Sequence, residues 1–271
     1  MKVFLMTDLE GVAGVINTTD WIYNDSKYYE KGKELLTKEV NAAIDGFFAA
    51  GADEVVVQDG HGYGAIDIDL LDPRAKLQRG WYGPGGGAFP FGMNETYDVY
   101  ACVGQHPKAG TEYGHLCHTG NFDVLDFQIN GISVGEYGEQ VLLAGQYGIT
   151  PIFASGCLAF TKEAEALVPG IETVAVKEGV MPGSGDECGN EVYEKRNWGA
   201  VHLQPQKARE LIREGAYNAM MRYKENPKSF KPTKVSAPFS KKIVYRQAMG
   251  KILPVVEKSG YDDLAALMNA W

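Results

Sequence analysis

Short runs of β-branched and other apolar residues alternate along the chain with longer amphipathic segments, and this alternation limits the possible folds more than any other feature. The run Glu54–Val57 is apolar almost without interruption, which is typical of a strand covered on both faces. In Lys33–Ala50 apolar residues recur at helical spacing, and Gly51 follows as a C-terminal cap. We therefore predict an α/β fold with a mainly parallel, layered sheet and helices on both faces.

The same patterns give approximate bounds for the other elements. The predicted strands are Val3–Met6, Glu54–Val57, Tyr97–Val103, Pro151–Ala154 and Thr173–Val176. The predicted helices are Lys33–Ala50, Glu139–Tyr147, Lys162–Leu167 and Pro205–Tyr223. A hairpin is expected over Val124–Ile129 and Ile132–Val134, because the intervening Asn130-Gly131 suits a type I′ turn.

The chain changes character after residue 225. From Asn226 to Ala237 it is rich in Lys, Pro and Ser, which is typical of a linker. We predict one α/β domain over residues 1–225, and over residues 226–271 the linker and a short C-terminal helical segment with apolar Leu264, Leu267 and Trp271. The Gly-, Pro- and aromatic-rich run Gly80–Gly92 fits none of these elements. A flap or an oligomer contact explains that run as well as a phosphate-binding loop does.

Charge and apolar content exclude some partners. The formal net charge of −9 disfavours a nucleic-acid partner, since phosphate backbones attract basic surfaces. No apolar run reaches membrane-spanning length, so we expect no membrane partner. The apolar run Val3–Met6 is too short for a signal peptide. The four cysteines lack Cys-x-x-Cys spacing, so we expect a cytoplasmic protein with reduced thiols.

Three of the predicted strands run directly into acidic or imidazole side chains. The first is followed by Asp8 and Glu10, the second by Asp59 and His61, and the third by His106. Each motif alone is more simply explained as a turn or a helix cap. However, the carboxyl ends of parallel strands share one edge of the sheet, where ligands bind in open α/β folds. We therefore expect these side chains to converge.

The spacing of the acidic residues points to a metal site. Asp8 and Glu10 are two residues apart, so on an extended backbone both carboxylates point to one side and repel unless a cation lies between them. Carboxylates together with imidazoles are the ligand set of zinc and its first-row neighbours. Glu136, between glycines at the start of a predicted helix, offers a further carboxylate. A two-metal site, which can activate water and polarise the bond that is attacked, therefore becomes possible.

More histidines lie in the run Gly114–Gly120. Either His115 or His118 could act as a nucleophile, a base or a stabiliser of the transition state. We expect His115 to face solvent, and His202, far along the chain, to lie at the surface. Cys117 is expected to be a buried structural residue rather than a nucleophile, because its neighbours are apolar.

Together these motifs resemble those of the D-aminopeptidase (DppA-type) zinc metallopeptidases. The matching runs are Met6–Gly14, Asp59–His61, Val103–His106, His118-Thr119, Asn130-Gly131 and Val134–Gly138, in unbroken order over about residues 1–180. The resemblance implies a site with two zinc ions (Zn²⁺) bridged by Asp8. It implies further that Glu10 and His61 complete one coordination sphere, that His106 and Glu136 complete the other, and that His118 is the catalytic histidine.

Members of this family remove N-terminal D-amino acids from short peptides and assemble as stacked rings that enclose their active sites. The resemblance therefore implies a hydrolase, a metallo-aminopeptidase with short peptides as substrates, and a ring-forming homo-oligomer. The chain departs from the family pattern at Gly60, where Ser is usual, and at Cys157, where Asp is common. Residues 179–193 and 236–271 also match the pattern poorly. These departures bear on substrate preference and on assembly.

Two other functions use the same residue types. A two-metal phosphoesterase would need cationic contacts to phosphate, and Lys108 is the only obvious one near the motifs. A metal-binding protein without turnover would keep the ligands but would not need His118. A nicotinamide dehydrogenase is disfavoured, because no Gly-x-Gly-x-x-Gly follows the first strand. The working hypothesis is a di-zinc aminopeptidase.

Overall fold

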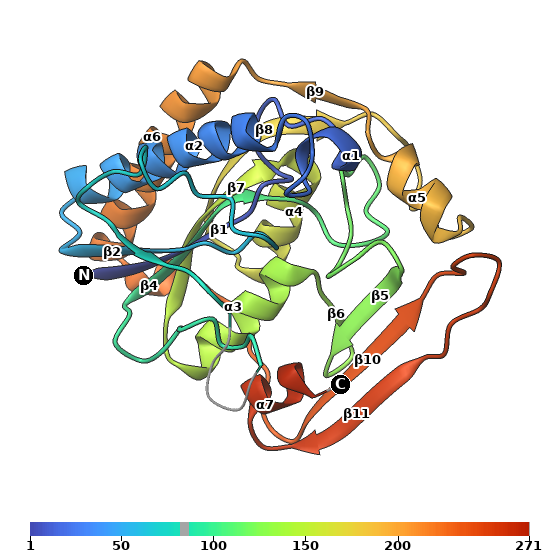
Figure 1. The fold of residues 1–271 in the computed structure, drawn as a ribbon. Helices are drawn as coiled ribbons and strands as arrows, with labels where there is room; N and C mark the ends of the chain where they lie inside the picture. The colour runs from blue at the N-terminus through green and yellow to red at the C-terminus, as the bar shows by residue number, and fades with distance from the viewer. Residues whose placement is uncertain (82–86, 271) are drawn as a thin grey trace.

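A seven-stranded sheet, in the order β3-β2-β1-β4-β7-β8-β9, forms the centre of the fold in the computed structural model, which describes residues 1–81 and 87–270 (Figure 1). All neighbouring strands are parallel except β8 and β9. The strands are β1 (Lys2–Thr7), β2 (Glu54–Gln58), β3 (Lys76–Gln78), β4 (Val99–Gln105), β7 (Thr150–Cys157), β8 (Glu172–Gly179) and β9 (Ala200–His202). The predicted mainly parallel sheet is thus confirmed.

Helices cover both faces of this sheet, as predicted (Figure 1). They are α2 (Tyr29–Ala49) and α6 (Pro205–Glu225) on one face, and α3 (Glu136–Gln146) and α4 (Leu158–Leu167) on the other. Successive side chains of β1 alternate between two buried cores. Val3 and Leu5 belong to the core with α2 and α6, whereas Phe4 and Met6 belong to the core with α3 and α4. This two-sided burial explains why the strand sequences are continuously apolar.

Three short helical elements lie outside these layers. They are α1 (Thr18–Trp21), α5 (Asn190–Arg196) and the 3₁₀ turn η1 (Pro227–Ser229). Within the residues that the structure describes, no helix combines the length and the apolar character needed to cross a bilayer.

A second, antiparallel sheet in the order β11-β10-β5-β6 joins the C-terminal segment to the middle of the chain. Its strands are β5 (Val124–Ile129), β6 (Ile132–Ser133), β10 (Phe239–Tyr245) and β11 (Val256–Tyr261). The first two form the predicted hairpin, and Asn130 and Gly131 have positive φ angles of 48° and 76°, as a type I′ turn requires. The expected C-terminal helix is α7 (Leu264–Asn269).

Strands β10 and β11 are not predicted from the sequence. In β10 the buried positions are Phe239, Lys241 and Ile243, so a lysine interrupts the apolar alternation that identifies a strand. The Lys241 ammonium donates to the carbonyls of Met268 and Ala270 at the end of α7, which makes its burial tolerable. The predicted helical segment therefore includes a hairpin that pairs with β5.

Two of the sequence predictions concern residues that the structure does not describe. Residues 82–86 of the run Gly80–Gly92, and Trp271, lie outside the described residues, so the roles considered for them stay predictions. The division of the chain at residue 225 also stays a prediction.

Candidate metal centre

Six polar side chains converge at the carboxyl end of the seven-stranded sheet. Asp8 and Glu10 follow β1, His61 follows β2, and His106 follows β4. His118 lies in the loop before β5, and Glu136 begins α3. All except Glu136 expose less than a tenth of their surface. We call this group the six-residue centre.

The loop after β1 packs against the end of β4, which brings together the residues that follow these two strands. The Asp8 N–H donates to the carbonyl of Val103 at 3.0 Å, and the Gly11 N–H donates to that of Gly104 at 2.6 Å. A Cβ atom on Gly11 would lie 2.2 Å from the carbonyl oxygen of Gln105. Only glycine therefore lets the Asp8 segment approach so closely the residues that precede His106.

Gln105 is a contributor that the motifs do not single out. Its Nε2 donates to Asp8 Oδ2 at 3.1 Å, and its side chain is buried. The available signal is its position, since it ends β4 directly before His106. Gln105 helps to fix the orientation of the Asp8 carboxylate.

Carboxylates and imidazoles alternate through the centre. His61 Nδ1 lies 3.2 Å from Asp8 Oδ1 and 3.1 Å from Glu10 Oε2. His106 Nε2 lies 3.4 Å from Asp8 Oδ2 and 3.5 Å from Glu136 Oε1. Asp8 thus faces His61 with one oxygen and His106 with the other, which is the orientation that a bridging carboxylate needs.

A backbone carbonyl fixes each of the three imidazole rings. The contacts are His61 Nε2 to Ile22 O at 2.9 Å, His106 Nδ1 to Pro107 O at 2.9 Å, and His118 Nδ1 to Leu116 O at 2.8 Å. Because a carbonyl only accepts, the contacting nitrogen carries the hydrogen in each ring. In a neutral ring the other nitrogen then presents its lone pair to the carboxylates, as in metal-binding histidines.

The close packing of these groups shifts their pKa values strongly. Burial, and then the charge of Glu10, raises the pKa of Asp8 to about 7. Burial alone would also raise the pKa of Glu10, but the charge of His61 holds it well below its usual range. Burial disfavours the protonated form of His106, yet Glu136 raises its pKa to about 10. The carboxylates therefore attract positive charge into this buried site.

The residues present fit a divalent metal. Two groups of residues each offer ligand atoms that lie within 4.8 Å of one another. One group is Asp8, Glu10 and His106, and the other is His106, His118 and Glu136. Glu10 Oε2 and His106 Nε2 are buried without a hydrogen-bond partner, although buried polar atoms normally have one. Both are atoms that zinc accepts as ligands. Geometry alone allows His118 to be either a ligand or a catalytic group.

Asp59, expected at the same edge of the sheet, does not join the centre. Its Oδ1 accepts the N–H groups of Ala65 and Ile66 at 2.7 and 3.3 Å, and its Oδ2 lies 3.0 Å from Arg79 Nε. Asp59 instead holds the loop that carries His61.

His115 is not solvent-facing, contrary to the expectation from sequence. It is fully buried, because its loop packs against distant segments, and its Nε2 lies 2.8 Å from the carbonyl of Ile16 and 3.1 Å from that of Trp198. Cys117 is buried as predicted, with its Sγ 3.1 Å from the Tyr193 hydroxyl. His202 is half-buried, and its Nδ1 accepts the Gly14 N–H at 3.1 Å.

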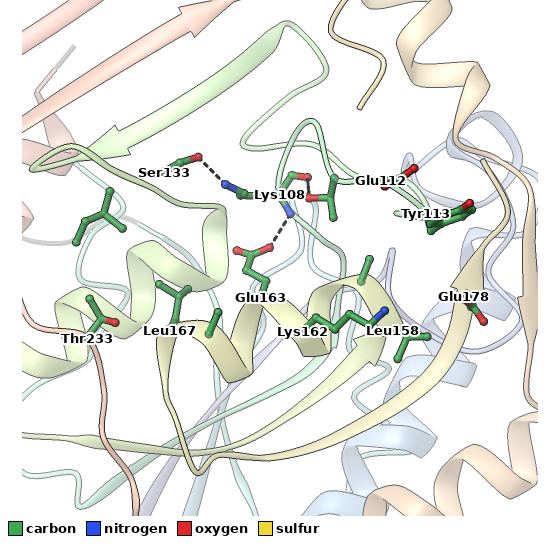
Figure 2. Close-up of a pocket in the computed structure, with 14 residues that line it drawn as sticks. Lys108, Glu112, Tyr113, Ser133, Leu158, Lys162, Glu163, Leu167, Glu178 and Thr233 are labelled. Atoms are coloured by element: carbon green, nitrogen blue, oxygen red, sulfur yellow. Dashed lines mark hydrogen bonds between the residues drawn. The ribbon is translucent and has the colours of Figure 1, made fainter. Parts of the chain in front are cut away.

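A pocket of about 490 Å³ is lined by residues of α4 and of the segments around Lys108 and Ser133 (Figure 2). Its lining includes Lys108 and Ser133 but no residue of the six-residue centre. Lys108 Nζ donates to Ser133 Oγ at 2.6 Å, and the Lys108 N–H donates to the Glu163 carboxylate at 3.0 Å. The one lysine considered as a phosphate contact is therefore engaged inside this separate pocket.

Comparison with known proteins identifies similar chains. The sequence model of the M55 peptidase family, described as D-aminopeptidase, matches residues 1–262. The chain is 32% identical over 179 residues to the D-aminopeptidase of Bacillus subtilis (strain 168). This alignment covers 66% of the chain and 64% of that relative, slightly less than two thirds of its length.

A solved structure shows the same similarity over nearly the whole chain. It is described as the Zn-dependent D-aminopeptidase DppA from Bacillus subtilis, a self-compartmentalizing protease. The TM-score is 0.83 at 26% sequence identity, over 99% of this chain and 95% of the other.

The buried His115 should make stability depend on pH. Burial lowers the pKa of His115 in the folded state to about 2, against 6.5 for an unperturbed histidine. Its contribution is therefore complete above pH 6.5 and is lost as the pH falls below 6.5, by about 1 kcal/mol between pH 6.5 and 5.5. Replacing it in His115→Gln, which keeps an N–H donor for Ile16, should remove that part of the dependence.

Urea unfolding of both proteins at several pH values measures this difference. Burial also lowers the pKa of the neighbouring His202, to about 4, so part of the acid sensitivity should remain in the variant. If both proteins lost the same stability on acidification, the lowered pKa of His115 would be contradicted.

Proposed function

The chain belongs to the M55 family of D-aminopeptidases, and from this premise we propose that it is a zinc-dependent aminopeptidase that removes N-terminal D-amino acids from short peptides. One observation carries the proposal: the six-residue centre presents buried carboxylate and imidazole atoms, of which Glu10 Oε2 and His106 Nε2 have no hydrogen-bond partner. The relatives described as D-aminopeptidases support the substrate class. A cytoplasmic location stays a prediction.

We propose that two zinc ions bind in each chain. Asp8 would bridge them, with Glu10 and His61 completing one coordination sphere and His106 and Glu136 completing the other. The two oxygens of Asp8, which face different imidazoles, support this assignment. When bound, zinc supplies the Lewis acidity that polarises a peptide carbonyl and promotes the ionisation of water.

His118 is the group we assign to proton transfer. Its ring lies between the rings of His106, at 3.9 Å, and Phe122, at 4.6 Å, so its plane is fixed. Nδ1 donates to Leu116 O, which leaves Nε2 as the acceptor. Burial, and then the charge of His106, lowers the pKa of His118, so the ring is neutral at neutral pH. Nε2 can then take a proton from the attacking water and return it to the leaving amine. In the alternative, Nε2 itself attacks the carbonyl carbon, the C–N bond breaks as the amine takes a proton from water, and water then hydrolyses the acyl-imidazole.

The alternatives have less support. A two-metal phosphoesterase would need a cation beside the centre, but Lys108 donates to Ser133 in the pocket of Figure 2. A metal-binding protein without turnover does not need a neutral imidazole fixed with one free nitrogen beside the ligand atoms. A panel of phosphate esters tests the first alternative, and the peptide assays below test the second.

Zinc removal tests the main proposal. The purified protein should contain two zinc ions per chain by elemental analysis and should hydrolyse D-alanyl dipeptides. A chelator should abolish this hydrolysis, and added zinc should restore it, because the carboxylates and imidazoles of the centre have no other means of polarising the carbonyl. The L-alanyl dipeptides are the matched control for stereochemical preference. Full activity in metal-free protein would contradict the proposal.

Replacement of the proposed proton-transfer group tests its role. His118→Ala should lower kcat by about 10²- to 10⁴-fold, the usual contribution of general acid–base catalysis. The zinc content should stay unchanged, because the other five side chains still provide the ligands. Loss of zinc together with activity would make His118 a ligand instead, and an unchanged kcat would exclude both roles.

We propose that this chain forms a ring-shaped homo-oligomer, because the similar solved structure is described as a self-compartmentalizing protease. Met249 and Ile252, between β10 and β11, expose 86% and 90% of their surface, which favours burial against a further copy. Light scattering on the protein eluted from a size-exclusion column should give a multiple of the 29.6 kDa chain mass. The double variant Met249→Asp, Ile252→Asp should shift the protein to smaller species. A wild-type protein that elutes as a monomer would contradict this extension.

A further inference from the structure

Lys177, near the end of β8, is a buried cation that binds backbone oxygens of the loop that follows β1. Its residue surface is 3% exposed. Its Nζ donates to the carbonyls of Val12 at 3.0 Å and Val15 at 3.2 Å, and also to the carbonyl of Glu10. An ammonium group has three N–H donors, so these three carbonyls use all of them.

The three carbonyls belong to the segment between β1 and α1, which carries two of the proposed ligands. This segment has no helix or strand of its own, and most of its residues are buried. Buried carbonyl groups need hydrogen-bond partners, and the sheet does not supply them here. A charged donor forms stronger hydrogen bonds than a neutral one, so Lys177 is an effective substitute for a strand partner.

Two other side chains hold the N–H groups of the same segment. Glu39 Oε1, from α2, accepts the Ala13 N–H at 3.0 Å, and His202 Nδ1 accepts the Gly14 N–H at 3.1 Å. These contacts lie further along the segment than the proposed ligands. Lys177 differs from both because it contacts Glu10 itself.

We propose that Lys177 is a positioning residue for the metal centre. By fixing the Glu10 carbonyl to β8, it sets the backbone from which the carboxylates of Asp8 and Glu10 project. Its ammonium is already saturated by carbonyls, so it takes no part at the reacting atoms. Burying an ammonium is costly, and a contact with the backbone of a proposed metal ligand is a place where that cost serves function. This inference rests on the proposed zinc-dependent function.

Replacing the ammonium by an apolar group of similar length tests the inference. Lys177→Met keeps the stem and removes the three donors. The chain offers a matched control in Lys241→Met, because Lys241 is equally buried and donates to the carbonyls of Met268 and Ala270, away from the centre. Circular dichroism establishes that both variants are folded, and competition with a chromogenic chelator then measures their zinc affinity.

Lys177→Met should bind zinc about 10- to 100-fold more weakly than the wild type, the usual effect of losing a contact behind a metal ligand. Lys241→Met should bind zinc as the wild type does. The free zinc concentration for half-maximal peptidase activity should rise by the same factor in Lys177→Met, with kcat at saturating zinc close to the wild-type value. A role in folding alone would lower the active fraction equally at every zinc concentration.

Each outcome decides the matter. Wild-type zinc affinity in folded Lys177→Met would overturn the positioning role, and so would equal weakening in both Met variants. If Lys177→Met does not fold, Lys177→Gln, which keeps two donors on a shorter stem, is measured in the same way with the same expectation. A wild-type protein that binds no zinc would instead overturn the proposed function, so the two failures are distinguishable.

Discussion

The mutual repulsion of buried carboxylates is the constraint on which the site depends. Asp8 and Glu10 are buried together at the sheet edge, with the half-buried Glu136 nearby, and like charges in such a place are costly unless cations compensate them. Imidazoles lie between the carboxylates, and the negative charge of Glu136 raises the pKa of His106 to about 10. The surrounding loops are built to hold this charge in a fixed arrangement.

The parallel sheet makes such an arrangement possible, because it delivers separate segments to one edge. The loop after β1 is tied to the end of β4 through Gly11 and Gly104, and to β8 through Lys177. The buried strands thus act as a rigid base, and this loop gains precision from its contacts with the strand ends. This division between a rigid base and tied loops is common where function lies on loops.

Local sequence patterns predicted the parts of the structure that local physics determines. Apolar runs identified the central strands, and four of the polar residues that follow them, Asp8, Glu10, His61 and His106, converge in the six-residue centre as expected. The burial of His115 was not predictable, because its partners Ile16 and Trp198 are distant in sequence. Strand β10 was missed because Lys241 occupies a buried position whose partners lie at the end of α7. Gln105 and Lys177 act through contacts that no local spacing encodes.

Each histidine of the centre contacts a main-chain oxygen, that of Ile22, Pro107 or Leu116, through the ring nitrogen that does not face the carboxylates. Every amino acid carries such an oxygen, so a point mutation at these three positions leaves the acceptor in place as long as the backbone path is kept. Ring orientation is therefore encoded in the course of the chain. Side chains at these three positions can therefore change without altering how the three imidazoles face the carboxylates.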